Sequence, residues 1–550
     1  MFSENYFMNR RLLFLVTFSF FTIASFAQPS KPKLVVGLVI DQMRWDYLYR
    51  YSDLYGTGGF KRLLSQGFSC ENTMIPYTPT VTGAGHTCIY TGSVPAIHGI
   101  VANDWIDQET GIFMYCAKDT NVITVGSSSI KEGQMSPRNM LSNTIGDELK
   151  LATNFRSKVI GIALKDRGGI FPAGHSANAA YWFDNKTGNW ITSNYYTNEL
   201  PAWVQKYNNR HVPDSLMKND WNLLYDKSKY TQSTEDDMPF EKVLESDKSR
   251  TFPHKYQSVM VSRDYDQFRP SPYGNTFTLQ FAKEAILNEK LGMGKVTDML
   301  CISVSSTDNI GHKFGPNSLE AEDTYLRLDL EIASFLTYLD KMLGKNNYLL
   351  FLSADHGAPQ IGNYLKQEKK YFTAGALNGN TVVKNLNKLC KEKFGADSLV
   401  KKVYDYQLYL DHAKMNEAAV DQKALKQFIV EKLKMIPEVW NAYDVDDFAQ
   451  VILPPVVREK IANSYYFRRS GDIQYFYKAQ YTDFTDSGVE HGAWYPYDSH
   501  IPLVWFGWKV KPGKLNREVY MTDIAPTIAA MLQIQMPNGC VGKVITELIK

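Results

Sequence analysis

The sequence predicts a doubly wound α/β fold, in which a mostly parallel central sheet is sandwiched between layers of helices. Two observations lead to this prediction: several short, nearly continuous apolar runs, and amphipathic helical patterns that separate them. Uninterrupted apolar runs are typical of strands that are covered on both faces, as in a parallel sheet. Strands that alternate with helices along the chain favour a doubly wound arrangement.

Three of the expected strands end beside an acidic residue. Residues 33–40 precede Asp41, residues 299–307 precede Asp308, and residues 348–354 precede Asp355. Ligands bind beyond the carboxyl ends of the strands in open α/β sheets, so we expect the three acids to lie at one edge. Further strands are expected at residues 158–163 and 501–506, and helices at residues 59–66, 319–343 and 524–532.

Two long segments do not follow this alternation. Residues 173–276 are rich in Tyr, Trp, Asn and charged side chains, and residues 364–486 contain a charged helical run at 421–435. We interpret both segments as insertions that fold beside or over the sheet, the second as a cap. The charged run is typical of a helix with one solvated face.

The first 27 residues have the pattern of a secretory signal peptide. Arg10 and Arg11 precede the apolar residues 12–26, and Ser25-Phe26-Ala27 supplies a small-residue cleavage site. An uncleaved anchor is the alternative. Because no later run reaches the roughly 20 apolar residues of a membrane helix, we expect a soluble catalytic domain at residues 28–550, exported to the periplasm or secreted.

Charge and cysteine content exclude other classes of protein. The formal net charge is +2, which gives no electrostatic basis for a nucleic-acid-binding body. The six cysteines are dispersed and form no Cys-x-x-Cys motif, so neither a disulfide scaffold nor a cysteine metal site is expected. One or two disulfides remain compatible with an oxidising compartment, and their pairing is left open.

Carboxylates and imidazoles recur in spacings that suit metal binding. Asp308 and His312 are four residues apart, so one helical turn would place both on the same face, with Gly311 permitting a close approach. Asp355-His356 follows an expected strand, whereas Asp411-His412 does not. Taken alone, each motif is also compatible with a surface ion pair. Together with Asp41 they predict a two-metal site, and zinc suits these ligands.

Thr82 is the candidate nucleophile. It is followed by Gly83-Ala84-Gly85, small residues that let a helix begin close to an anion and present free N–H groups to it. A threonine becomes a good nucleophile only when its pKa is lowered, which a metal can do. A threonine that merely caps the helix is the alternative interpretation.

Lys165 and Arg167 are candidates for binding phosphate oxygens. In an extended segment their side chains would project to the same side, with Asp166 pointing away. Two cations aimed together would offset the second negative charge that a phosphate monoester carries and a diester lacks. Ordinary surface charges are the alternative.

The ordered set Asp41, Thr82, Asp308-x-x-Gly311-His312, Asp355-His356-Gly357 and His491-Gly492 resembles the alkaline phosphatase superfamily, on the threonine-nucleophile branch that includes the nucleotide pyrophosphatase/phosphodiesterases. The segment Thr522-Asp523-Ile524-Ala525-Pro526-Thr527 resembles the closing strand and helix of that superfamily. Asn103 with Lys165 and Arg167 resembles the phosphate clamp of alkaline phosphatases on this branch. The resemblance also favours His491 over His500, which spacing alone does not exclude.

The resemblance implies an exported alkaline phosphatase that uses two Zn²⁺ ions and a covalent phosphothreonine. One ion would be bound by Asp41, Asp355, His356 and the Thr82 oxygen, and the other by Asp308, His312 and His491. The expected substrates are small phosphate monoesters used for phosphate acquisition, and a monomer is expected. A phosphodiesterase with the same metals is the alternative, and an inactive binding protein is a third. No motif in the insertions identifies the leaving group.

Overall fold

The computed structural model describes residues 31–371, 373–483 and 487–549. Its centre is a ten-stranded sheet whose middle strands are parallel, which confirms the predicted fold class. Strand β1 (Leu34–Ile40) lies between β10 (Asp298–Val304) and β11 (Tyr348–Ser353), and every side chain of these three strands is buried. The expected N-terminal signal peptide lies outside the described residues.

The strand order is β20-β2-β19-β11-β1-β10-β7-β8-β9-β6. Parallel pairing continues from β10 through β7 to β8, whereas β19 joins β11 antiparallel. The outer strands are β7 (Val159–Ala163), β8 (Ala179–Asp184), β9 (Asn189–Ser193), β6 (Thr124–Val125), β19 (Leu503–Gly507), β2 (Phe68–Cys70) and β20 (Gly513–Leu515). Strands β8 and β9 come from the first predicted insertion, so part of that segment extends the sheet.

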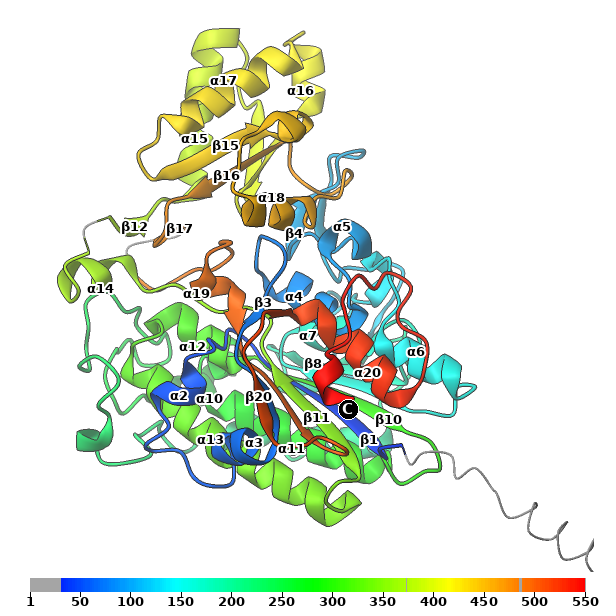
Figure 1. The fold of residues 1–550 in the computed structure, drawn as a ribbon. Coiled ribbons are helices and arrows are strands. Elements are labelled where there is room, and N and C mark those ends of the chain that lie inside the picture. Colours follow the sequence, from blue (N-terminus) through cyan, green and yellow to red (C-terminus); the bar gives the residue numbers. More distant parts are fainter. Residues whose placement is uncertain (1–30, 372, 484–486, 550) are drawn as a thin grey trace, which may run out of the picture.

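Helices cover both faces of this sheet (Figure 1). One layer contains α4 (Thr82–Thr91), α6 (Ile145–Ala152), α7 (Asp166–Ala173) and α20 (Ile524–Leu532), which contact one another. The other layer contains α3 (Phe60–Gln66), α11 (Tyr273–Asn288), α12 (Ser306–Phe314) and α13 (Leu319–Leu343). The predicted helices at 319–343 and 524–532 have the bounds that the sequence indicated.

Two local predictions were wrong. The strand expected at residues 299–307 ends at Val304, and α12 begins at Ser306, so Asp308 lies in the first turn of a helix. The hydroxyl of Thr307 donates to the carbonyl of Asp41 at 2.6 Å, which ties this early helix start to the end of β1. Residues 165–167 do not form the extended segment that was predicted, because only Lys165 is extended, and α7 begins at Asp166 and places Arg167 in its first turn.

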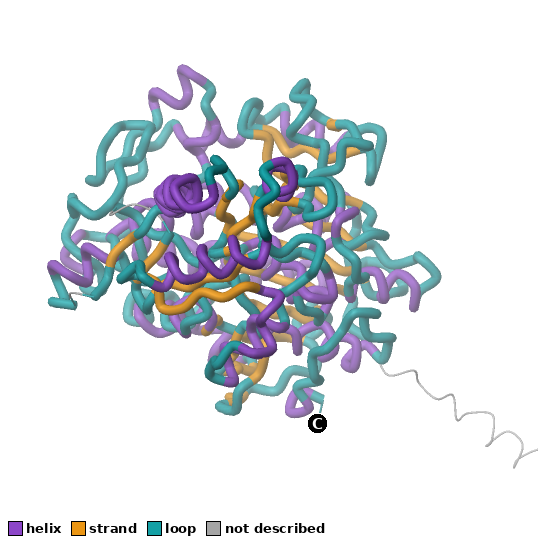
Figure 2. Tube along the Cα trace, turned by 90° about the horizontal axis from the view of Figure 1, so that it is seen from above, coloured by secondary structure: helices purple, strands orange, loops and turns teal. Residues whose placement is uncertain are grey.

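The second insertion folds into a cap with its own sheet and core. Strands β13 (Val400–Tyr404), β14 (Gln407–Leu410), β16 (Ile473–Tyr477) and β15 (Val439–Asp444) lie in that order. Helices α15 (Gly379–Phe394) and α17 (Gln422–Lys434) pack on them through a separate hydrophobic cluster. The cap stands at the top of Figure 1 and lies nearest the viewer in Figure 2. Helix α17 buries Leu425, Ile429 and Leu433 and exposes its charged face, as predicted.

One helix of the cap is hydrogen-bonded to the loop that precedes Thr82. In α18 (Pro455–Ala462) and the residues just after it, Lys460 donates to the carbonyl of Ile75, and Asn463 donates to the carbonyl of Pro76 at 2.8 Å. The Ser464 hydroxyl accepts the N–H of Thr78 at 2.9 Å. Through these contacts the cap fixes the loop on which α4 begins.

Within the described ranges, no helix is both long and apolar enough to cross a membrane. All six cysteines are free thiols, five of them buried.

Candidate metal and nucleophile site

The predicted metal ligands converge at the carboxyl edge of the central strands. Asp41 follows β1, Asp355 follows β11, and Asp308 projects from the first turn of α12. All three carboxylates are buried, with exposed fractions of 2% or less. The predicted imidazoles lie among them, so residues from four distant parts of the chain share one site.

One group consists of Asp308, His312 and His491, whose potential ligand atoms all lie within 4.8 Å of one another. His312 Nε2 is 3.2 Å from Asp308 Oδ1, and His491 Nε2 is 3.6 Å from the same oxygen. The spacing of four residues therefore does place Asp308 and His312 on one helical face, as the sequence predicts.

A second group combines Asp41, Asp308 and His356 within the same distance. His356 Nε2 lies 3.5 Å from Asp41 Oδ1 and 3.4 Å from Asp355 Oδ2. Asp355 also faces this imidazole nitrogen, but the group of ligand atoms within 4.8 Å contains Asp308 in place of the Asp355 that the sequence predicted. The rings of His356 and His491 stack at 3.5 Å, so the two groups are contiguous.

Backbone carbonyls orient all three imidazoles. The Nδ1 atoms of His312, His356 and His491 lie 2.8, 3.0 and 2.7 Å from the carbonyls of Val489, Gly357 and Thr80. A carbonyl only accepts, so each Nδ1 carries a proton, and each Nε2 is the ring nitrogen that faces the carboxylates. A hydrogen bond from Nδ1 to a carbonyl fixes the ring orientation and leaves Nε2 as the atom that can bind a metal.

The donor set fits a pair of divalent ions. Asp41 Oδ1 and His356 Nε2 are buried and have no hydrogen-bond partner within the described part of the chain. Asp41 Oδ2 and Asp355 Oδ2 are held by ion-pair contacts with the Lys165 ammonium and the His86 ring. Leaving buried polar atoms unpaired is costly, and a metal ion would satisfy Asp41 Oδ1 and His356 Nε2. Burial, together with the charge of Asp355, raises the pKa of Asp41 well above its usual range. Mixed carboxylate and imidazole donors, three for each ion, suit zinc.

His500 takes no part in this cluster. Its Nε2 pairs with the carbonyl of Glu71 at 2.8 Å, and its ring stacks on Trp45. His86 contacts the cluster through Asp355, with Nδ1 3.2 Å from Asp355 Oδ2. The Asp411-His412 dipeptide lies in the cap, where His412 pairs with Asp472.

Thr82 is the first residue of α4 and not its cap. The capping position is Val81, and no side chain caps this helix. The Thr82 hydroxyl instead accepts from Lys165 Nζ at 3.4 Å. The same ammonium donates to Asp308 Oδ2 at 2.5 Å and lies 2.7 Å from Asp41 Oδ2. Lys165 thus joins the candidate nucleophile to both groups of metal ligands.

Asn103 lies beside the start of the same helix. Its Oδ1 accepts the N–H of Gly83 at 2.9 Å, and its Nδ2 group makes no hydrogen bond to any of the described residues, so it can donate to a ligand. Arg167, in the first turn of α7, donates through Nη1 to the hydroxyl of Tyr115 at 3.2 Å. Burial lowers the pKa of Lys165, but the charges of Asp308 and Asp41 outweigh it, so the pKa is raised on balance. The charge of Arg167 also lowers it, which shows that the two cations lie close together.

Three residues that contact the site were not predicted from the sequence. Gln42, at a φ of 64°, donates from Nε2 to Asp308 Oδ1 at 2.8 Å and from its backbone N–H to Asp355 Oδ1 at 3.1 Å. A Cβ on Gly311 would lie 1.8 Å from Gln42 Oε1, so the close approach that Gly311 predicted is made by Gln42. Tyr115 and Arg269 carry no motif. Burial lowers the pKa of Arg269, whose charge interacts with Asp166 and Arg167.

The chain is similar to known proteins over nearly its whole length. The family described as type I phosphodiesterase / nucleotide pyrophosphatase matches residues 35–489. The chain is 49% identical to alkaline phosphatase PhoV of Synechococcus elongatus, over 95% of this chain and 94% of that protein. It is 50% identical to a Myroides odoratus protein named calcium-transporting ATPase, over 97% of each chain.

Alkaline phosphatase PafA of Elizabethkingia meningoseptica is 47% identical over 94% of this chain and 95% of that protein. A crystal structure of PafA superposes with a TM-score of 0.92, covering 95% of this chain and 100% of that chain. A second PafA structure carries substitutions of one threonine, one asparagine, one lysine and one arginine. Those four residues have the same order and spacing as Thr82, Asn103, Lys165 and Arg167.

Proposed function

This chain belongs to the type I phosphodiesterase / nucleotide pyrophosphatase family, and within it we propose that the protein is an alkaline phosphatase, which hydrolyses phosphate monoesters to inorganic phosphate and an alcohol. The relatives named alkaline phosphatases, which cover nearly the whole chain, support this proposal. The observation that carries it is the placement of the Thr82 hydroxyl 3.4 Å from the Lys165 ammonium, beside two groups of metal ligands.

The cationic side of the site favours a monoester over a diester. A monoester carries a second negative charge on its non-bridging oxygens, and charge-assisted hydrogen bonds to those oxygens are strong. Lys165 donates to the Thr82 hydroxyl, and Asn103 accepts from the next residue of the helix. Arg167 is close enough to Lys165 for their charges to interact, so all three side chains can donate to a phosphate bound at this end of the helix. The N-terminus of α4 adds backbone N–H groups directed at the same anion.

In the proposed reaction, Thr82 Oγ attacks phosphorus in line with the leaving oxygen, and the alcohol departs as phosphothreonine forms. Water then attacks the phosphothreonine, which releases phosphate and restores the hydroxyl. Lys165, Arg167 and Asn103 hold the three non-bridging oxygens throughout. Two Zn²⁺ ions, one on Asp41, Asp355 and His356 and one on Asp308, His312 and His491, would supply the charge that stabilises the attacking and leaving oxygens.

The proposal extends to the place where the enzyme works. The sequence of residues 1–27 matches a secretory signal peptide, so the mature chain would act outside the cytoplasm. Phosphate esters released outside the cell are then its substrates, which suits an enzyme of phosphate acquisition.

A substrate comparison with a nucleophile variant tests the proposal. The zinc-loaded enzyme should cleave p-nitrophenyl phosphate much faster than bis-p-nitrophenyl phosphate, and Thr82→Ala should lose at least about 10³-fold in turnover, because the covalent step is removed. Thr91→Ala, at the far end of the same helix and equally buried, is the matched control. Undiminished turnover by Thr82→Ala would rule out the covalent step, and faster diester cleavage would assign the chain to the phosphodiesterases.

A further inference from the structure

Tyr115 connects two of the residues that surround the candidate phosphate site. It ends strand β5 (Phe113–Tyr115), which pairs with β4 (Asp104–Ile106) in a short hairpin. The hairpin begins directly after Asn103, and the N–H of Cys116 donates to the Asn103 carbonyl at 2.8 Å. Because Asp104 pairs with Tyr115, the open end of this hairpin positions both Asn103 and the tyrosine.

The hydrogen bonds of the tyrosine hydroxyl have a fixed direction. A guanidinium has only donors, so Arg167 Nη1 donates to Tyr115 Oη over 3.2 Å. The hydroxyl proton must then go to another acceptor, and it goes to Asp166 Oδ1 in a short hydrogen bond. Asp166 is itself fixed, because the same oxygen accepts the backbone N–H of Arg167 at 2.5 Å.

The group that hydrogen-bonds to Arg167, the Tyr115 hydroxyl, is uncharged. A carboxylate bound directly to the guanidinium would neutralise its charge and occupy two of its donors. The tyrosine hydroxyl occupies one donor and separates the guanidinium from the Asp166 side chain. Arg167 Nε has no partner within the described part of the chain. Nε of Arg167 is thus available to donate to an anion.

We propose that Tyr115 is a positioning residue, which holds the Arg167 guanidinium toward the non-bridging oxygens of a phosphate monoester and so sets the preference for monoesters over diesters. The inference rests on the proposed phosphatase function. Removing the hydroxyl leaves Asp166 as a nearby carboxylate that can capture the guanidinium. The loss should fall on substrates that need both cations of the site, which are the monoesters.

The test is Tyr115→Phe, which removes only the hydroxyl. We expect kcat/KM for p-nitrophenyl phosphate to fall by at least about tenfold, as expected for a hydrogen bond to a charged group, and kcat/KM for bis-p-nitrophenyl phosphate to change less than about twofold. In the Arg167→Ala background, Tyr115→Phe should cause almost no further loss on monoesters, because its effect passes through Arg167.

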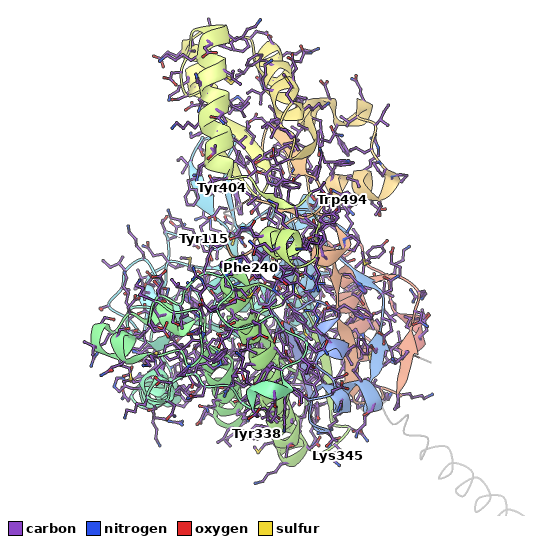
Figure 3. All side chains as sticks on the ribbon, turned by 90° about the vertical axis from the view of Figure 1, so that its left-hand side faces the viewer. Tyr115, Phe240, Tyr338, Lys345, Tyr404 and Trp494 are labelled. Carbon is purple, nitrogen blue, oxygen red and sulfur yellow. The ribbon has the colours of Figure 1, made fainter. Side chains whose placement is uncertain are left out.

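Tyr338→Phe is the matched control. Its hydroxyl donates to the carbonyl of Lys283 at 2.9 Å, and Figure 3 shows Tyr338 at the opposite end of the core from Tyr115. The control should leave both substrates unchanged. If Tyr115→Phe does not fold, Asp166→Ala should show a substrate split in the same direction but smaller, because it frees the tyrosine hydroxyl to rotate and also removes the carboxylate that could capture the guanidinium.

Equal losses on both substrates, or additive losses with Arg167→Ala, would overturn the role of Tyr115. Unchanged monoester cleavage by Tyr115→Phe would do the same while leaving the phosphatase proposal intact. A wild-type enzyme that does not cleave monoesters would instead refute the proposed function itself, so the two failures are distinguishable.

Discussion

Replacing Lys165 by methionine should destabilise the metal-free protein far more than the zinc-loaded protein. The Lys165 ammonium lies between Asp41 and Asp308, 2.7 and 2.5 Å from one oxygen of each, and all three side chains are buried. Methionine has a similar length and no charge. Without zinc, the substitution leaves two buried carboxylates with no cation between them.

The magnitude has a lower and an upper bound. Removing one partner of a buried ion pair typically costs about 3–5 kcal/mol. A carboxylate can avoid that cost by taking up a proton, which from an ordinary pKa of 3.8 costs at most about 5 kcal/mol at a pH of about 7.5 and about 2 kcal/mol at a pH of about 5.5. The loss of stability should therefore be about 3–5 kcal/mol near neutral pH and about half as much in mild acid.

Urea unfolding, followed in a chelator and in excess zinc, measures this difference. With zinc bound, the ions neutralise the carboxylates, so the Lys165→Met loss should shrink to about 1 kcal/mol or less. Lys150→Met is the control, because Lys150 is 6% exposed like Lys165 but donates to the amide oxygen of Asn178. An equal Lys165→Met loss with and without zinc, or one that does not fall with pH, would refute the reasoning.

Two further predictions concern other parts of the molecule. Burial lowers the pKa of Lys460 to about 8, from an ordinary value of 10.5, so the unfolded chain binds this proton more tightly than the folded protein does. The free energy of unfolding should therefore rise by about 3 kcal/mol between these two pH values. Lys460→Met should remove that rise, as measured by urea unfolding curves. His491→Ala should cost about one equivalent of bound zinc by elemental analysis, whereas His500→Ala should retain both, since only His491 lies among the carboxylates; zinc loss from His500→Ala alone would reverse that assignment.

Periodicity predicted the parts of this fold that bury a continuous apolar run. The strands that end near Asp41 and Asp355 and helix α13 lie close to where the sequence indicated. Periodicity did not predict the local conformation where polar residues begin a helix just after a strand. Ser306 and Thr307 begin a helix two residues after β10, so the strand ends earlier than predicted, although the helical turn predicted from Asp308 to His312 is present. Asp166 begins another helix after β7, so Arg167 is not on the extended segment that was predicted.

The residues that contact the site without being ligands could not be predicted from the sequence, for a different reason. Gln42 and Tyr115 act through hydrogen bonds to side chains that are distant along the chain; Asp308 is 266 residues from Gln42, and Arg167 is 52 residues from Tyr115. No period or motif marks such a contact. Gly311 gave the only hint, because a missing side chain indicated that another group comes close, without identifying that group.

The strand order also dictates when during synthesis the site can form. Strand β2, near the N-terminus, has β19 and β20 as its partners in the sheet, and both are among the last strands to be made. His491 is likewise made late, whereas Asp41 and Thr82 are made early. Such long-range pairing folds slowly and leaves early segments waiting for late ones. Catalysis should therefore begin only after nearly the whole chain has been synthesised, so phosphatase activity reports completed folding and a C-terminally truncated chain should be inactive.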